Sequence, residues 1–271
     1  MVFNGNKSIY SSRLQNYMSL GLDYSPLPNT TLNEKFIINT RYDFNDNIKR
    51  YPTINVITIG TDFNPLDITA NVFNLKTSPH RPTDASLFNH IPFYLRKLSD
   101  VNSFPPSDKY VLRKKIVIND ITYLACYGYL IDDIVYKGDI TKYANIDTDY
   151  VNISKVDTNT GEYLNPVLRD NIDLDKQPDY YLGTFFKMFF FFNEDELKEI
   201  FNAFTILYPN ETLKRITEIG VASSIYIEDI NEIVWCGIEY FIDVDYDIED
   251  AVKETFLEFY IEVGNSEVIR G

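Results

Sequence analysis

The sequence predicts an α+β fold, mainly antiparallel β-structure of the sandwich or barrel-like kind, with two helices near 194–219 and long loop excursions. Hydrophobic residues make up 45% of the 271 residues, which is enough apolar surface for a core. Aromatic residues make up 15%, and aromatic and β-branched side chains favour strands. Several segments also alternate apolar and polar residues with the period of two that half-buried strands show.

The chain divides into an N-terminal arm over 1–30 and a single mainly-β domain over 31–271, with a loop insertion at about 138–180. Apolar residues in the arm keep a rough helical spacing before the proline-marked stretch SPLPNTT. An arm that reaches a neighbouring subunit and a frayed terminus both explain this pattern.

Two strands are expected first, at 33–42 and 53–62, because an Asp- and Asn-rich turn separates two apolar runs. A short helical piece is predicted over 84–91, where Thr83 or Asp84 is suited to cap it and Pro92 interrupts it. The next segment, FYLRKL, is expected to form a strand.

A β-hairpin is predicted over 110–133, with its turn at Asn119-Asp120, because both residue types tolerate positive φ. Its return strand, ITYLACYGYLI, is apolar on both faces, which indicates a central strand covered on two sides. Within it, Gly128 marks either a bulge or a close backbone approach.

The insertion at 138–180 is rich in Asp and Asn and lacks regular periodicity, so we expect a loop that contacts a partner. The apolar run 185–192 is too short to cross a bilayer and predicts a buried strand. A helix is then predicted from Asn193, where Glu196 completes a capping box. A second helix is predicted from Asn210, ending near Gly220.

Three further strands are predicted in the C-terminal part of the chain, each with one face in water. They span 224–229, 233–246 and 255–263.

Chemical motifs are absent from the sequence: it contains no nucleotide-binding, serine-hydrolase or zinc-protease signature. Its two histidines, His80 and His90, are interpreted as hydrogen-bonded structural residues, and Cys126 and Cys236 as buried free thiols rather than a disulfide. We therefore predict no catalytic residue, no cofactor and no metal site, and hence a protein that is not an enzyme.

One acidic stretch resembles a calcium loop, because Asp243, Asp245, Asp247 and Glu254 occupy its first, third, fifth and twelfth positions. However, Ile248 stands where such a loop requires glycine. In the alternative, the first two aspartates lie on the exposed face of a strand and Asp247 caps a short helix. The sequence leaves the binding of a cation there open.

Charge is unevenly distributed along a chain whose net charge is −15, a balance that argues against broad nucleic-acid binding. Acids dominate 228–262, while bases dominate 96–115. The candidate subunit interface consists of Arg96, Lys97, Arg113, Lys114 and Lys115. The two regions can meet head-to-tail in a ring, or neutralise each other within one fold.

Targeting signals are not expected, because the first residues lack the continuous apolar core of a secretory signal. No apolar run is long enough for a transmembrane helix either, so we expect no membrane partner.

The segments FNHIPFYLRKLSD and KYVLRKKIVINDITYLACYGYLI resemble virion structural proteins of tailed bacteriophages, of the neck, ring and tail-assembly type found in crAss-like phages. The resemblance covers roughly 85–131 and carries over no catalytic residue. It implies a repeated, homo-oligomeric subunit that docks to portal, tail or ring proteins around the DNA channel, in a virion assembled in the host cytoplasm.

An alternative function is a carbohydrate-binding or carboxylate-dependent hydrolytic module of a phage tail device. It requires an aromatic-lined cleft that holds two acids. Trp235 and Glu239 are the candidates, because they share one face of a predicted strand.

Overall fold

The computed structural model divides the chain into two compact units. The smaller contains residues 1–3, 134–189 and 259–271, and the larger contains residues 4–133 and 190–258. The residues described are 5–8, 10, 20, 32–36, 52–61, 80–81, 83–100, 108–131, 139–146, 149–155, 180–210, 214–227 and 232–268.

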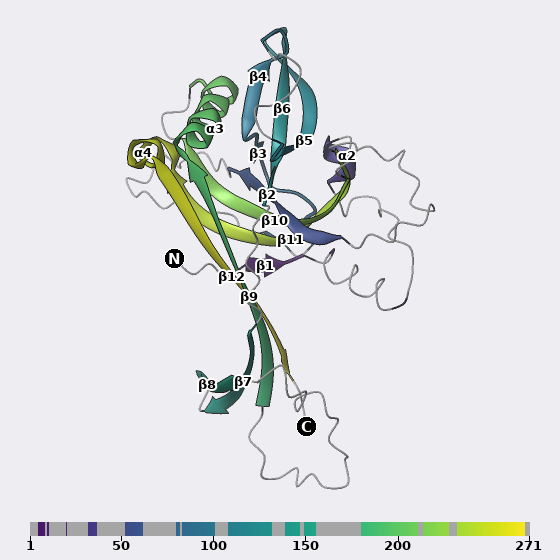
Figure 1. Cartoon of the computed structure of the whole chain (residues 1–271), viewed down its shortest axis with the longest axis vertical. Helices are drawn as coiled ribbons and strands as arrows, with labels where there is room; N and C mark the ends of the chain where they lie inside the picture. Colours follow the sequence, from purple (N-terminus) through teal and green to yellow (C-terminus); the bar gives the residue numbers. More distant parts are fainter. Residues whose placement is uncertain are drawn as a thin grey trace, which may run out of the picture. The chain divides into compact units, whose positions relative to one another are not determined.

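The larger unit is organised around an antiparallel sheet of eight strands, drawn in Figure 1. The strands are β1 (Gly5–Lys7), β2 (Thr53–Gly60), β3 (His90–Ile91), β4 (Tyr94–Lys97), β5 (Tyr110–Ile118), β6 (Ile121–Leu130), β10 (Arg215–Ile227) and β11 (Glu232–Asp247). Their order is β1-β11-β10-β2-β6-β4, with β3 paired to β2 and β5 paired to β6. The predicted mainly antiparallel α+β class is therefore confirmed, and the described strands do not close into a barrel.

The predicted hairpin is confirmed as β5 and β6. Asn119 and Asp120 connect the strands with φ values of 48° and 61°, the left-handed conformation that matches a tight turn to the twist of its strands. Strand β6 pairs with β5 along one edge and with β4 and β2 along the other, so it is central, as its apolar faces predict. Gly128 marks a close approach, because a Cβ there would lie 2.9 Å from Val111 Cγ2.

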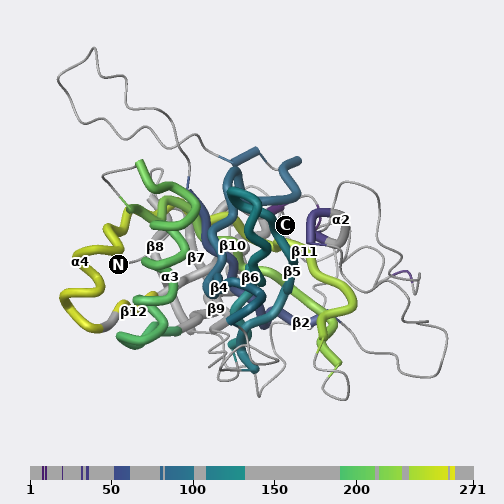
Figure 2. Tube along the Cα trace, turned by 90° about the horizontal axis from the view of Figure 1, so that it is seen from above, coloured from purple at the N-terminus to yellow at the C-terminus, as the bar shows by residue number. Residues whose placement is uncertain are grey.

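Helix α3 (Glu194–Leu207) begins as its sequence predicts. Asn193 Oδ1 accepts a hydrogen bond from the Glu196 amide, and the Glu196 carboxylate accepts one from the Asn193 amide, which completes the capping box. Its buried face includes Leu197, Ile200 and Phe204. In Figures 1 and 2 it lies beside helix α4 (Ile248–Glu254), with which it is in contact.

The second predicted helix is wrong, because residues 215–220 belong to strand β10. This strand lies between β2 and β11 and is buried along nearly its whole length. Since both of its faces are buried, it lacks the alternation that distinguishes a strand, and the spacing of Ile216 and Ile219 is equally compatible with a helix.

Two shorter assignments are also wrong. Helix α2 (Asn33–Phe36) occupies the start of the strand predicted over 33–42, because Leu32 and Phe36 are both buried in the core on one helical turn. The segment predicted as helix over 84–91 contains no helix among its described residues. It ends instead in β3, whose His90 and Ile91 pair with Gly60 and Ile59.

The remaining strands are β7 (Asp139–Ile146), β8 (Asp149–Lys155), β9 (Tyr180–Asn193) and β12 (Phe256–Val268), which form a sheet in the order β12-β9-β7-β8. Strands β9 and β12 confirm the strands predicted at 185–192 and 255–263. Strands β7 and β8 lie within 138–180, where we expected a loop. Their sequences, DITKYANI and DYVNISK, contain several β-branched and aromatic residues, a strand signal that the Asp- and Asn-rich surroundings obscured.

The described part of the N-terminal arm packs on its own chain. Strand β1 pairs with residues 240–242 of β11, and the Tyr10 ring lies 5.2 Å from that of Trp235. Gly237 makes room for this ring, because a Cβ there would lie 2.3 Å from Tyr10 Cζ. A contact between the arm and a neighbouring subunit stays a prediction, because most of the arm lies outside the described residues.

Both cysteines are buried free thiols, as the sequence predicts. Burial raises the pKa of Cys126 to about 12 and also raises that of Cys236.

Gly237→Ala is expected to displace Tyr10 and expose Trp235, because the new methyl group would occupy the position of the tyrosine ring. Trp235 is the only tryptophan of the chain, so its fluorescence reports on this contact directly. We predict a red-shifted emission and stronger quenching by acrylamide, as for Tyr10→Ala. Leu20→Ala, at a side chain that is already exposed, should leave the spectrum unchanged. An unshifted spectrum for Gly237→Ala would contradict the packing.

Candidate functional site

A buried carboxylate, Glu218, lies on β10 between β11 and β2 and is only 2% exposed. Its Oε2 accepts a hydrogen bond from the Phe88 amide at 3.1 Å, and its Oε1 accepts one from the Asn89 amide at 3.2 Å. His80 Nε2 lies 2.7 Å from Oε2. We call this group of Glu218, His80 and the amides of Phe88 and Asn89 the Glu218 clamp.

The clamp depends on a glycine in the adjacent strand. Gly60 of β2 is the direct register partner of Glu218. A Cβ at this position would lie 2.4 Å from Glu218 Oε1 and 2.7 Å from the Asn89 carbonyl oxygen. The absence of a side chain therefore lets the carboxylate lie across β2 and reach the loop.

The imidazole of His80 is held by aromatic stacking as well as by the carboxylate. Its ring lies between Phe88 and Phe241, at centroid distances of 4.4 and 4.2 Å and an interplanar angle of 16° to each. Its Nδ1 is 3.4 Å from Asp84 Oδ2, a longer and weaker approach. His80 thus binds the loop that precedes β3 to the sheet, through the Glu218 carboxylate and the Phe241 ring.

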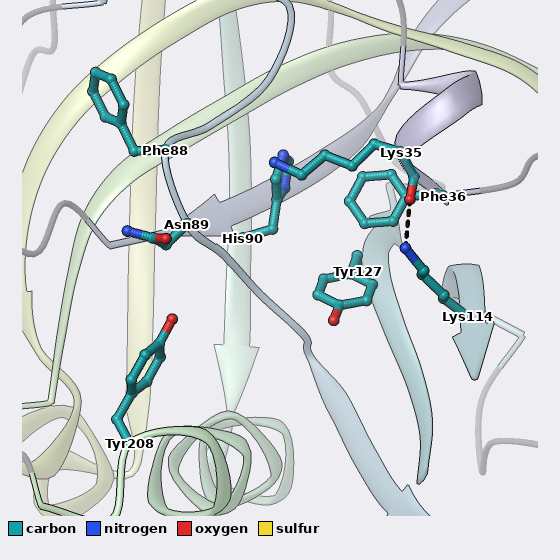
Figure 3. A pocket seen from close by; sticks show the side chains of 8 residues that line it. All are labelled: Lys35, Phe36, Phe88, Asn89, His90, Lys114, Tyr127 and Tyr208. Atoms are coloured by element: carbon teal, nitrogen blue, oxygen red, sulfur yellow. Dashed lines mark hydrogen bonds between the residues drawn. The ribbon is translucent and has the colours of Figure 1, made fainter. Parts of the chain in front are cut away.

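A pocket of about 180 Å³ opens beside the clamp (Figure 3). The lining residues come from α2, the loop before β3, the strands β3, β5 and β6, and the segment after α3. They are Lys35, Phe36, Phe88, Asn89, His90, Lys114, Tyr127 and Tyr208. The clamp binds the backbone of Phe88 and Asn89 and so holds one side of this pocket in place.

The histidine of the pocket, His90, is buried and neutral. Burial, with smaller contributions from the charge of Lys35 and from His80, holds its pKa well below the usual value of 6.5. Nε2 accepts a hydrogen bond from the Leu87 amide at 3.2 Å, so the proton of the neutral ring lies on Nδ1. Among the described residues Nδ1 has no partner. An unsatisfied buried donor of this kind costs about 1–3 kcal/mol.

Two ammonium groups line the same pocket. Lys35 Nζ donates to Ser86 Oγ at 3.3 Å and to the Leu87 carbonyl at 3.4 Å, while Lys114 Nζ donates to the Lys35 carbonyl at 2.9 Å (Figure 3). Desolvation lowers the pKa of Lys35, which the charge of Glu218 opposes and that of Lys114 reinforces. Neither lysine forms an ion pair with a carboxylate in the part of the chain that the structure describes.

The five cations of the candidate interface do not form one surface. Directly paired residues of antiparallel strands point to the same face. Arg96 and Lys115 both pair with Leu124, whereas Lys97 pairs with Tyr123 and Lys114 with Ala125, on the opposite face. Arg113 pairs with Cys126 and so joins the face of Arg96, whose guanidinium forms an ion pair with Glu199 of α3.

The pair named for the alternative carbohydrate function is also buried. Trp235 is 3% and Glu239 7% exposed, and neither residue lines the pocket. The open aromatic cleft that this function requires is therefore not located at these two residues.

The calcium-loop resemblance is explained by strand and helix geometry. Asp243 and Asp245 are exposed on β11, and Asp247 caps α4 by accepting a hydrogen bond from the Glu249 amide at 2.9 Å. This confirms the alternative interpretation. Across the described residues, no group of three or more His, Cys, Asp or Glu side chains has the arrangement of a metal site.

Sequence reasoning missed the central residue of the site. Both histidines are hydrogen-bonded, as predicted. The sequence did not identify Glu218, because its hydrogen-bond partners lie about 130 residues away in the chain. The available signal was one acid within the otherwise uncharged stretch ITEIGVASSIYI, where a buried carboxylate requires donors.

A family model described as a family of unknown function (DUF7208) matches residues 5–270. The chain belongs to this family. The match to DUF7208 includes every residue of the Glu218 clamp and of the pocket. No curated protein and no solved structure matches the chain. Among the described helices, none is long and apolar enough to cross a membrane.

Glu218→Gln should destabilise the larger unit by about 1–3 kcal/mol, because the amide leaves at least one buried donor of the clamp without an acceptor. Urea denaturation measures the change. Glu258→Gln, at an exposed carboxylate, is the matched control and should have little effect. Equal denaturation midpoints for the two variants would show that the clamp does not stabilise the fold.

The free energy of unfolding is expected to fall as the pH falls below about 6.5, because unfolded His90 then binds a proton that folded His90 does not. His90→Gln removes this contribution. Its stability should therefore depend less steeply on pH than that of the wild type between about pH 7.5 and 5.5. Parallel pH profiles for both proteins would contradict the assignment of a neutral, buried His90.

Proposed function

We propose that the protein is a repeated structural subunit of a tailed-phage particle, part of the neck, ring or tail assembly that connects portal and tail around the DNA channel. The resemblance over 85–131 suggests this role, and the surface of the hairpin it includes supports it. The end of that hairpin offers an apolar contact surface.

This surface, the hairpin tip, consists of Leu98, Val117 and Ile121, which are 38%, 68% and 40% exposed. They lie at the same end of the hairpin but on two faces: Val117 pairs with Thr122, whose carbonyl accepts a hydrogen bond from the Leu98 amide, while Ile121 pairs with Ile118 on the opposite face. Six large hydrophobic side chains are exposed among the described residues, and three of them lie at this end of the hairpin. Clustered exposed apolar side chains are typical of surfaces that bind another protein.

Charge near the tip is balanced rather than basic. Lys97 and Lys115 are exposed there, but so are Asp100 and Asp120. The contact that the tip offers is therefore mainly apolar, and its occupant in this proposal is a neighbouring subunit of the same particle. The proposed contact surface is thus the apolar hairpin tip, and not the candidate interface of five cations that the sequence suggested.

A strongly acidic surface on α4 and the start of β12 suits the same role. The acids Glu249, Asp250, Glu254 and Glu258 are all exposed, and the one cation among them in this stretch, Lys253, pairs with Asp250. Such a surface repels DNA phosphates, which favours a channel in which DNA slides rather than binds.

The test of the role is mass spectrometry of purified virions from the phage whose genome carries this gene. We expect the protein in several copies per particle, at a ratio to the portal protein that a ring requires. Its absence from purified virions would overturn the proposal.

Substitution of the tip should block assembly without unfolding the subunit. Val117→Asp combined with Ile121→Asp places charges where an apolar partner surface would pack, and is expected to eliminate incorporation into virions. Thr53→Asp combined with Thr205→Asp makes the same change in charge at two exposed polar positions outside the hairpin, and this control should reduce incorporation far less. Circular dichroism confirms folding, and normal incorporation of the double variant would exclude the tip as an interface.

A further inference from the structure

The pocket beside the Glu218 clamp contains more hydrogen-bond donors than its own residues use. Lys114 Nζ carries three protons, and one of them is donated to the Lys35 carbonyl. The proton on His90 Nδ1 has no acceptor among the described residues, and both hydrogen bonds of Lys35 Nζ are long. The polar side of the pocket is thus suited to a ligand that accepts hydrogen bonds.

The charges of the pocket also favour an anion. Of the described residues, two lysines line it and no acid does. The negative charge that acts on Lys35 is that of Glu218. The Glu218 oxygens are already bonded to two backbone amides and to His80. A cation would meet two ammonium groups, whereas an oxyanion would meet donors that lack acceptors.

The size and walls of the pocket restrict the ligand further. A volume of about 180 Å³ is below the roughly 300 Å³ at which sites for drug-sized ligands begin, so the ligand has few heavy atoms. One wall is aromatic: the Phe36 ring lies 4.8 Å from Tyr127 and 5.0 Å from His90, the latter edge-on. Figure 3 shows these rings next to Lys35 and Lys114, so a planar or apolar portion of the ligand would have a surface to pack on.

We propose that this pocket binds a small oxyanion, a phosphate or a carboxylate, between the ammonium groups of Lys35 and Lys114 and beside the His90 ring. The site is independent of the hairpin tip and of the proposed virion role. Binding would supply acceptors for the unused donors and would fasten α2 to β3 and β5, which contribute these three side chains.

Two neighbouring lysines on β5 provide the test. Lys114 lines the pocket, whereas Lys115 is exposed on the opposite face of the strand, so Lys114→Met and Lys115→Met make the same change in charge at different places. Inorganic phosphate, acetate and benzoate are each titrated into the full chain at constant ionic strength, with binding measured by calorimetry. We expect saturable binding that Lys114→Met weakens about tenfold or more and that Lys115→Met leaves unchanged.

A second measurement on the wild type guards against a variant that fails to fold. The imidazole signals of His90 in NMR spectra should shift with the bound fraction, and the pKa of His90 should rise, since a bound anion favours the protonated ring. Preference for phosphate or for the two carboxylates then identifies the ligand class. The absence of a saturable shift for all three anions, or equal affinities for the two lysine variants, would overturn the proposal.

Discussion

The buried carboxylate of Glu218 is the interaction on which the arrangement of the larger unit depends. Moving a carboxylate from water into a protein interior costs several kcal/mol, which hydrogen bonds must offset. Here the donors are the amides of Phe88 and Asn89 and the His80 side chain, all from one loop. The carboxylate is therefore satisfied only when that loop lies against β10, and the loop fits there only because Gly60 has no side chain.

The path of this loop determines the position of β3. Residues 88 and 89 lead directly into that strand, so the clamp brings His90 into the pair with Gly60 and into the core, where desolvation keeps it neutral. The same backbone forms one side of the pocket that Lys35 and Lys114 line. A single buried charge on the sheet thus leads to a cationic, donor-rich pocket in a protein whose net charge is −15.

Local signals in the sequence predicted local structure well. The Asn119-Asp120 turn and the capping box at Asn193 each depend on residues within a few positions, and both are confirmed. Burial on two faces removes the periodicity of β10, so its first half resembles a helix, whereas its end falls in the strand predicted at 224–229. The pocket was not predicted, because it joins residues from α2 to the end of α3, and the interface cations were divided between two faces by strand register.

Hydrogen exchange of individual backbone amides tests the central role of Glu218 most directly. The amides of Phe88 and Asn89 lie in a loop and belong to no strand ladder, so only their hydrogen bonds to the carboxylate account for protection. If Glu218 binds the loop to the sheet, both amides should exchange as slowly as neighbouring amides of β10. Their hydrogen bonds to the carboxylate should then break only when the larger unit unfolds. Exchange at the rate of an exposed loop would contradict the account.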